Sequence, residues 1–233
     1  MSDFPFDAVI FDCDGVLVDS EPITNRVLST MLGELGWDIG VEETMRIFVG
    51  KTVRDEAARI EAQTGVAITS EWLASFRARR NAALDSELVA IPGAVDAVRA
   101  LHRMLDGRIA VASGADRHKV DMQLAKVGLL DCFEDRVFSG HDMTRSKPFP
   151  DVYLAAAAAL GVDPVRCAVV EDTATGATAG VAAGATVFGY SPAGGAGPHG
   201  ADTLRAAGVA AVFDDMVQLP ALLAGWSRVA RRA

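Results

Sequence analysis

Two aspartates one residue apart follow a short apolar run near the start of the chain. Ala8–Phe11 is the kind of run that a fully buried parallel strand requires, and Asp12, Asp14 and Gly15 come after it. In open α/β sheets, ligands bind beyond the carboxyl ends of the strands. Two acids at this spacing can share a hard cation, or one can attack while the other handles protons. An isolated pair of this kind is more often an acidic turn that ends a strand, so the rest of the chain decides.

Other chemically competent residues follow two later apolar runs. Ser113 ends the second run, Glu171 and Asp172 end the third, and Lys147 lies in a loop between them. In one parallel sheet the carboxyl ends share an edge, so these residues can converge with Asp12. Several carboxylates around one point repel each other unless a divalent cation lies among them. A hydroxyl and a lysine suit a phosphoryl group, as hydrogen-bond donor and charge neutraliser. The set predicts phosphoryl chemistry with a metal.

The pattern of elements predicts how these residues are positioned. Between residues 92 and 233, helical stretches alternate with short apolar runs, which predicts a doubly wound parallel α/β sheet. Residues 16–91 show only helical periodicity, so we expect an all-helical unit inserted after the first strand, with Ser70 as the N-cap of one helix. The predicted domains are a Rossmann-like core of residues 1–15 and 92–233, and a helical insert of residues 16–91. The Gly- and Pro-rich residues 191–200 are expected to form a loop.

Composition limits the class of protein and of partner. The 233 residues are 50% hydrophobic and 23% charged, enough for a main domain with an insertion. A net charge of −9 without a basic stripe argues against a nucleic-acid partner. Three scattered cysteines without a CxxC pair indicate a reducing compartment and free thiols. With no basic leader and no run of membrane-spanning length, we expect a cytoplasmic protein without a membrane partner.

Four segments together resemble the four motifs of the haloacid dehalogenase superfamily. They are DCDGVLVDS from residue 12, VASG from residue 111, SKPFPD from residue 146 and VVEDTATG from residue 169. The resemblance spans essentially the whole chain, and the helical insert matches the first-position cap of that family. It implies a phosphoric monoester hydrolase in which Asp12 is the nucleophile and forms an aspartyl-phosphate. It also implies that Asp14 protonates the leaving oxygen and then activates water.

The same resemblance implies a metal site. Mg²⁺ would be held by Asp12, by the backbone carbonyl of Asp14 and by Asp172. Glu171 would act either as a direct ligand or through a water molecule. The expected partner is a small phosphorylated metabolite, such as a sugar or sugar-acid phosphate, and the chain is expected to be a monomer or a weak homo-oligomer.

The resemblance further implies how the phosphoryl group is bound. Ser113 and Gly114 would bind the phosphoryl oxygens, and Lys147 would neutralise charge on the nucleophile and the phosphate. In the cap, Lys51 and Arg54 are the candidates for contact with an anionic substrate. An equally good interpretation is that these two residues lie at the start of a helix and contact only water.

Hydrolysis and phosphoryl transfer within one substrate are close alternatives. The chain is similar to the phosphoglucomutase and phosphatase-like subfamily, whose β-phosphoglucomutases carry a histidine twelve residues after the nucleophile. Thr24 occupies that position here, and the arginine of the cap turn in residues 50–54 is shifted by one. Both departures favour a phosphatase. Residues 85–88 and 138–148 resemble the bacterial 6-phosphogluconate phosphatase group.

A non-enzymatic alternative is a receiver-like module in which an aspartate is phosphorylated as a switch. Such modules also place acids, a hydroxyl and a lysine on a doubly wound sheet. They carry no long helical insert after the first strand, so the insert of residues 16–91 argues against this alternative.

Overall fold

The computed structural model describes residues 4–48, 52–192 and 200–227 of the chain. Lys51 and most of the loop predicted at residues 191–200 lie outside these ranges. The chain divides into two compact units, one made of Met1–Val18 and Ala90–Ala233, the other of Asp19–Val89.

The strands of the first unit form one six-stranded sheet in the order β3-β2-β1-β4-β5-β6. The strands are β1 (Ala8–Phe11), β2 (Ile109–Ser113), β3 (Val137–Ser139), β4 (Cys167–Glu171), β5 (Thr186–Tyr190) and β6 (Ala211–Phe213). Every neighbouring pair is parallel. The four central strands β2, β1, β4 and β5 are buried along their whole length, which explains their continuous apolar runs. The strand order reverses beside β1, where open α/β sheets bind their ligands.

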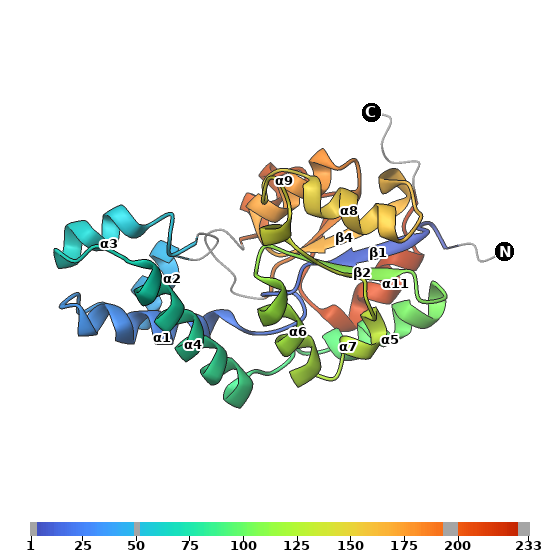
Figure 1. The fold of residues 1–233 in the computed structure, drawn as a ribbon. Helices are drawn as coiled ribbons and strands as arrows, with labels where there is room; N and C mark the ends of the chain where they lie inside the picture. The colour runs from blue at the N-terminus through green and yellow to red at the C-terminus, as the bar shows by residue number, and fades with distance from the viewer. Residues whose placement is uncertain (1–3, 49–51, 193–199, 228–233) are drawn as a thin grey trace. The chain divides into compact units, whose positions relative to one another are not determined.

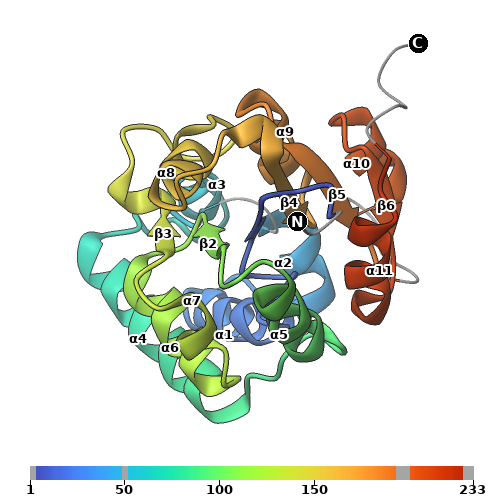
Figure 2. The ribbon, with the colours of Figure 1, turned by 90° about the vertical axis from the view of Figure 1, so that its right-hand side faces the viewer.

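Helices cover both faces of this sheet (Figures 1 and 2), with α8 and α9 on one face and α5, α6 and α7 on the other. The helices of this unit are α5 (Ala94–Met104), α6 (Arg117–Lys126), α7 (Leu130–Phe133), α8 (Asp151–Ala159), α9 (Ala174–Ala182), α10 (Ala201–Ala206) and α11 (Leu219–Ala224). The predicted doubly wound α/β fold is confirmed. The α8 and α9 face is packed largely through small side chains, because Ala156, Ala177 and Ala179 lie buried in one core cluster with Ala8 and Ile10 of β1.

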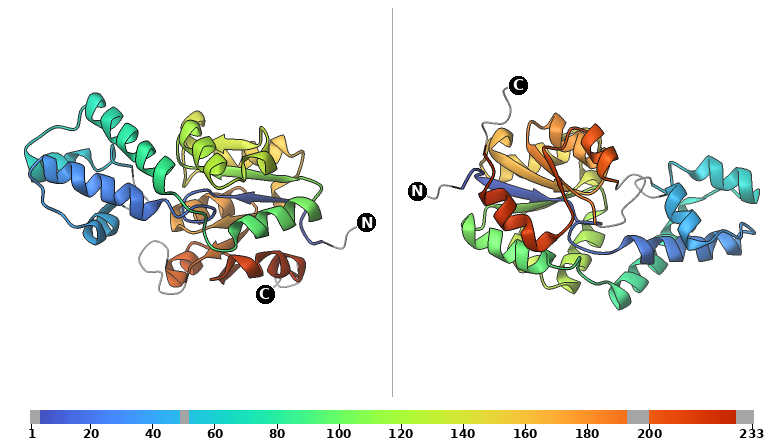
Figure 3. Two further views of the ribbon diagram at one scale, coloured as in Figure 1. Left: turned by 90° about the horizontal axis from the view of Figure 1, so that it is seen from below. Right: turned by 180° about the vertical axis from the view of Figure 1, so that it is seen from behind.

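In the second unit, the described residues form four helices around a core of their own. They are α1 (Glu21–Glu34), α2 (Val41–Phe48), α3 (Ala57–Thr64) and α4 (Ser70–Glu87). The helices α1 and α4 pack side by side (Figure 3), and Leu28, Met31, Ile60 and Phe76 are among the buried side chains of this core.

Two details of the insert differ from the sequence expectation. The N-cap of α4 is Thr69, not Ser70, because the Thr69 hydroxyl accepts a hydrogen bond from the Trp72 amide at 3.2 Å. Residues 16–18 and 90–91, which we assigned to the insert, group with the sheet unit. The reason is backbone pairing, since Ile91 N donates to Leu17 O at 3.0 Å and Val18 forms a bridge with Ala90. Within the described ranges, no helix combines the length and apolarity that crossing a membrane requires.

Candidate active site

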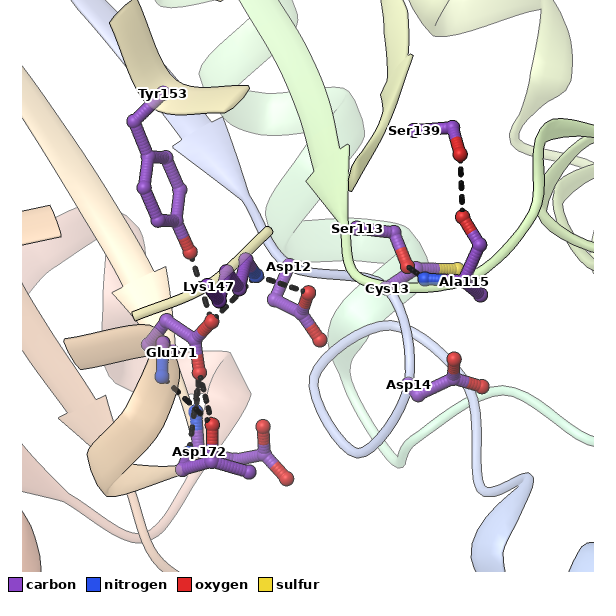
Figure 4. A network of polar contacts seen from close by, with 12 residues as sticks. Asp12, Cys13, Asp14, Ser113, Ala115, Ser139, Lys147, Tyr153, Glu171 and Asp172 are labelled. Carbon is purple, nitrogen blue, oxygen red and sulfur yellow. Dashed lines mark hydrogen bonds and ion pairs between the residues drawn. The ribbon is translucent and has the colours of Figure 1, made fainter. Parts of the chain in front are cut away.

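The structure brings four of the predicted residues together at the carboxyl edge of the sheet. Asp12 follows β1, Glu171 is the last residue of β4, and Asp172 comes next. β1 pairs directly with β4, so the three carboxylates meet across neighbouring strands. Lys147 reaches the same point from the loop before α8 (Figure 4).

Lys147 lies between two of these carboxylates. Its Nζ donates to Asp12 Oδ1 and to Glu171 Oε1, each at 2.6 Å. The side chains of Lys147 and Asp12 are each 9% exposed, and that of Glu171 is 1% exposed. Burial alone would lower the pKa of Lys147, but the two carboxylates outweigh it and hold the pKa well above its ordinary value. Lys147 is therefore a fixed positive charge beside the expected nucleophile.

Glu171 accepts five hydrogen bonds within the site. Its Oε1 receives Lys147 Nζ at 2.6 Å and the Tyr153 hydroxyl at 2.8 Å. Its Oε2 receives the amides of Asp172 and Thr173 at 3.0 and 3.1 Å and the Thr173 hydroxyl at 3.1 Å. Burial raises the pKa of Glu171, but Lys147 and these hydrogen bonds more than offset it and leave the pKa below its ordinary value. Glu171 is thus an ionised anchor for Lys147.

The acidic cluster fits a hard divalent cation. Oxygens of Asp12, Glu171 and Asp172 lie within 4.8 Å of one another, and all three residues are buried. Three carboxylates against the single ammonium of Lys147 leave two net negative charges. Burial raises the pKa of Asp12, and the neighbouring carboxylates raise it further. Lys147 lowers it, but the pKa stays well above its ordinary value. A divalent ion among oxygen ligands would balance this charge.

Gly15 makes this cluster possible. Its φ is +76°, and a Cβ built there would lie 2.0 Å from Asp172 Oδ2. Any side chain at this position would displace the carboxylate, so the turn after β1 requires glycine for its conformation and for its close approach to Asp172.

Ser113 and Gly114 form the turn at the end of β2. Ser113 is buried, and its Oγ accepts a hydrogen bond from the Ala115 amide at 3.0 Å, so the hydroxyl proton can point to another acceptor. The Ser139 hydroxyl at the end of β3 donates to Ala115 O at 2.7 Å and holds the turn in place. Gly114 is exposed, and a Cβ built there would meet nothing within 4 Å.

Asp14 does not join the acidic cluster. Its carboxylate points away from Asp12 (Figure 4) and binds Lys119 and Gln123 of α6 instead. Burial raises the pKa of the adjacent Cys13 thiol well above its ordinary value, and the carboxylates of Asp14 and Asp12 add to this effect.

Three residues of the site were not identified from the sequence. They are Tyr153, whose ring also lies 4.8 Å from Lys147 Nζ, and the pair Lys119 and Gln123. The last two are spaced four residues apart on the helix that follows Ser113, a spacing that places them on one face. That spacing was the available signal, but ordinary surface helices show it as well.

The cap candidates belong to the other unit. Arg54 is exposed in the turn before α3, and Lys51 lies outside the described residues. Thr24, at the position where β-phosphoglucomutases carry a histidine, lies on α1, and its buried hydroxyl oxygen has no hydrogen-bond partner within the part of the chain that the structure describes. Contact of Lys51 or Arg54 with substrate stays a prediction.

Comparison with known proteins identifies the family. Residues 6–184 match the haloacid dehalogenase-like hydrolases. The 6-phosphogluconate phosphatase of Escherichia coli (strain K12) is 34% identical over 223 residues, which cover 94% of this chain and 96% of that protein. Hexitol phosphatase B of the same strain is 33% identical over 180 residues, 76% of this chain and 79% of that protein.

A solved structure agrees with this relationship. The crystal structure of a HAD family hydrolase from Deinococcus radiodurans, with bound phosphate and sodium, has a TM-score of 0.78 and 36% identity, and the match covers 94% of this chain and 96% of that one. The family match spans most of the chain, and two of these relatives cover nearly all of it at more than 30% identity. The chain therefore belongs to the haloacid dehalogenase-like hydrolases and is a phosphatase of that family.

Proposed function

We propose that this phosphatase depends on Mg²⁺ and hydrolyses phosphate monoesters of small sugars and sugar acids, 6-phosphogluconate among them. The observation that carries the proposal is the buried Lys147 ammonium, held by Glu171 against Asp12 at the acidic edge of the sheet. The substrate class is supported by the relatives, which include a 6-phosphogluconate phosphatase and a hexitol phosphatase.

In the first step, an Asp12 carboxylate oxygen attacks phosphorus and the bond from phosphorus to the sugar oxygen breaks. The product on the enzyme is an aspartyl-phosphate at Asp12. Asp14 gives a proton to the departing sugar oxygen, which leaves as an alcohol. Lys147 lies 2.6 Å from Asp12 Oδ1, so its charge offsets the negative charge that gathers around the reacting group.

In the second step, water attacks the phosphorus of the aspartyl-phosphate. Asp14, now a carboxylate, takes a proton from that water, and the bond from phosphorus to Asp12 breaks. Inorganic phosphate leaves and Asp12 returns as a carboxylate. Ser113 donates its hydroxyl proton to a phosphoryl oxygen in both steps, and Gly114 offers its backbone amide.

Asp12, Asp172 and the backbone carbonyl of Asp14 are the groups that would hold Mg²⁺. Once bound, the ion supplies Lewis-acid neutralisation of the phosphoryl oxygens. Glu171 already accepts five hydrogen bonds, so in this proposal it holds Lys147 and the start of α9 and is not a direct ligand.

Thr24 favours hydrolysis over a mutase reaction. A mutase needs an acid/base group in the cap, and a threonine hydroxyl does not titrate in the range that such a group uses. In this proposal the helical unit of Asp19–Val89 supplies substrate selectivity through Lys51 and Arg54.

The decisive experiment measures phosphate release from a panel of phosphorylated metabolites, in Mg²⁺ and in EDTA. The panel includes 6-phosphogluconate and glucose 1-phosphate, and Asp12→Asn is the inactive control. We expect Mg²⁺-dependent release that is greatest for sugar and sugar-acid phosphates. Formation of glucose 6-phosphate without phosphate release would instead identify a mutase, and release that persists in EDTA or in Asp12→Asn would contradict the mechanism.

A further inference from the structure

The Asp14 carboxylate is held by two side chains of α6. Lys119 Nζ lies 2.8 Å from both Asp14 oxygens, and Gln123 Nε2 donates to Asp14 Oδ1 at 2.8 Å. The Lys119 side chain is only 8% exposed, against 24% for that of Asp14, and Gln123 is fully buried. Lysine and glutamine side chains are rarely buried to this degree unless they are hydrogen-bonded, so their contacts with Asp14 are part of the folded core and not a chance contact on the surface.

Both donors are themselves fixed in place. The Gln123 amide oxygen lies 3.6 Å from the buried Cys13 thiol, an arrangement that directs its NH₂ group to Asp14. Lys119 lies in the first turn of α6, where its amide donates to the N-cap residue Asp116 at 3.0 Å. α6 begins four residues after Ser113, so the phosphoryl-binding turn and the support of Asp14 belong to one short segment.

We propose that Lys119 and Gln123 are positioning residues that hold the Asp14 carboxyl group in the orientation its proton transfers require. This rests on the proposed function, in which Asp14 serves the leaving oxygen. In an in-line displacement the attacking and leaving oxygens lie on opposite sides of phosphorus, so the acid must stand apart from the nucleophile. Asp14 is turned away from Asp12 (Figure 4), and its contacts with Lys119 and Gln123 direct it toward α6, an orientation that agrees with this requirement.

Lys119 acts through Asp14 and not on the phosphoryl group. Its ammonium contacts both oxygens of Asp14, whereas Lys147 is the ammonium beside Asp12. Proton transfer depends on the donor lying within hydrogen-bond reach of its partner, and a partly exposed aspartate that lost these contacts would populate other rotamers.

The test compares two substrates whose leaving groups differ in basicity. A sugar phosphate needs its leaving oxygen protonated, whereas p-nitrophenyl phosphate releases a stable phenolate and needs little help. We expect Lys119→Met, which keeps the length of the side chain, to lower kcat/KM for the sugar phosphate about 10- to 100-fold. For p-nitrophenyl phosphate we expect a change of less than about 3-fold, because kcat/KM reports the steps up to leaving-group departure.

A double-variant comparison shows whether Lys119 acts through Asp14. In the Asp14→Asn background, Lys119→Met should change kcat/KM for the sugar phosphate by less than about 3-fold, because the group it positions is already lost. Gln123→Met should also lower kcat/KM for the sugar phosphate more than for p-nitrophenyl phosphate, but by a smaller factor than Lys119→Met. Lys119→Arg should retain part of the activity on the sugar phosphate that Lys119→Met loses. Lys126→Met, an exposed lysine on the same helix, is the matched control and should leave both substrates unaffected.

Three results would overturn the inference. Equal losses for both substrates in Lys119→Met and Gln123→Met, with unchanged thermal unfolding, would assign Lys119 to the phosphoryl group. If the losses in kcat/KM from Lys119→Met and Asp14→Asn add up in the double variant, Lys119 does not act through Asp14 and would likewise be assigned to the phosphoryl group. Equal losses with a lowered Tm in both variants would assign the two residues to stability alone. If Asp14→Asn itself fails to distinguish the two substrates, the role of Asp14 in the proposed function fails, independently of Lys119.

Discussion

At the scale of single residues, Tyr153 connects Lys147 to the body of the fold through Glu171. Its hydroxyl donates to Glu171 Oε1, the same oxygen that receives Lys147, and its ring lies against the Lys147 ammonium. An ionised carboxylate in a buried site depends on each of its donors, because water cannot replace a lost one.

Tyr153→Phe keeps the ring and removes only the hydroxyl. We expect the free energy of unfolding to fall by about 2 kcal/mol, the range for a buried hydrogen bond to a charged group. Activity should fall less than in Lys147→Met, because the ammonium stays beside Asp12. Urea unfolding and phosphate release measure the two effects. A Tyr153→Phe protein as stable as the wild type would show that the hydroxyl contributes nothing to holding Glu171.

Gly15 and Gly36 form a matched pair of glycines in the left-handed region. Their φ angles are +76° and +91°, but a Cβ at Gly15 would lie 2.0 Å from Asp172 Oδ2 and one at Gly36 would meet nothing within 4 Å. Alanine at either position should therefore destabilise the protein by about 1 kcal/mol through backbone strain. Only Gly15→Ala should also raise the Mg²⁺ concentration needed for half-maximal activity, about 10-fold or more. Equal Mg²⁺ dependence in the two variants would contradict the assignment of Asp172 to the metal.

At the scale of elements, the same substitution should have opposite effects on two helices. Gly33 lies exposed on α1 with open space around it, whereas a Cβ at Gly180 on α9 would lie 2.8 Å from Val187 Cγ2 in β5. Gly33→Ala should stabilise by about 0.5–1 kcal/mol through helix propensity. Gly180→Ala should destabilise by about 1–2 kcal/mol, because a β-branched core residue cannot move aside without strain. Urea denaturation separates the two outcomes, and a stabilising Gly180→Ala would show that α9 can shift away from the sheet.

The elements also show what the sequence could predict and what it could not. The strands β1, β2 and β4 were readable because buried parallel strands are continuous apolar runs, and their shared edge placed Asp12, Glu171 and Asp172 together. The bonds from Lys119 and Gln123 to Asp14 were not readable, since they join residues 105 and 109 positions apart. Buried polar side chains on a helix have the same spacing as solvated ones, so only the fold distinguishes them. A helix as short as α7 cannot be predicted from periodicity, because its four residues complete little more than one turn.

At the scale of the whole molecule, the buried charge of Asp12 lowers the free energy of unfolding of the metal-free protein. Asp12 ionises less readily in the folded protein than in the unfolded chain, because burial raises its pKa despite the ion pair with Lys147. Such a carboxyl group is protonated in both states at low pH and destabilises the folded state once the pH exceeds its unfolded pKa. The metal-free protein should therefore lose stability through Asp12 as the pH rises from about 4 to the raised folded-state pKa, and the loss through Asp12 is complete above that value.

Asp12→Asn removes that charge without changing the size of the side chain. The variant should therefore be more stable than the wild type without metal and should gain less stability from Mg²⁺. In EDTA at pH 7.5 we expect the variant to unfold at a higher urea concentration than the wild type, with the difference shrinking as the pH falls toward 4. Added Mg²⁺ should stabilise the wild type by about 2.7 kcal/mol at a hundred times its Kd and the variant by much less, because binding to the folded state alone shifts the equilibrium. Asp38→Asn, an exposed residue of the helical unit, should behave like the wild type throughout. An Asp12→Asn protein that is less stable than the wild type in EDTA would mean that the ion pair with Lys147 outweighs the burial of the charge, so that the ionised Asp12 would stabilise the folded state.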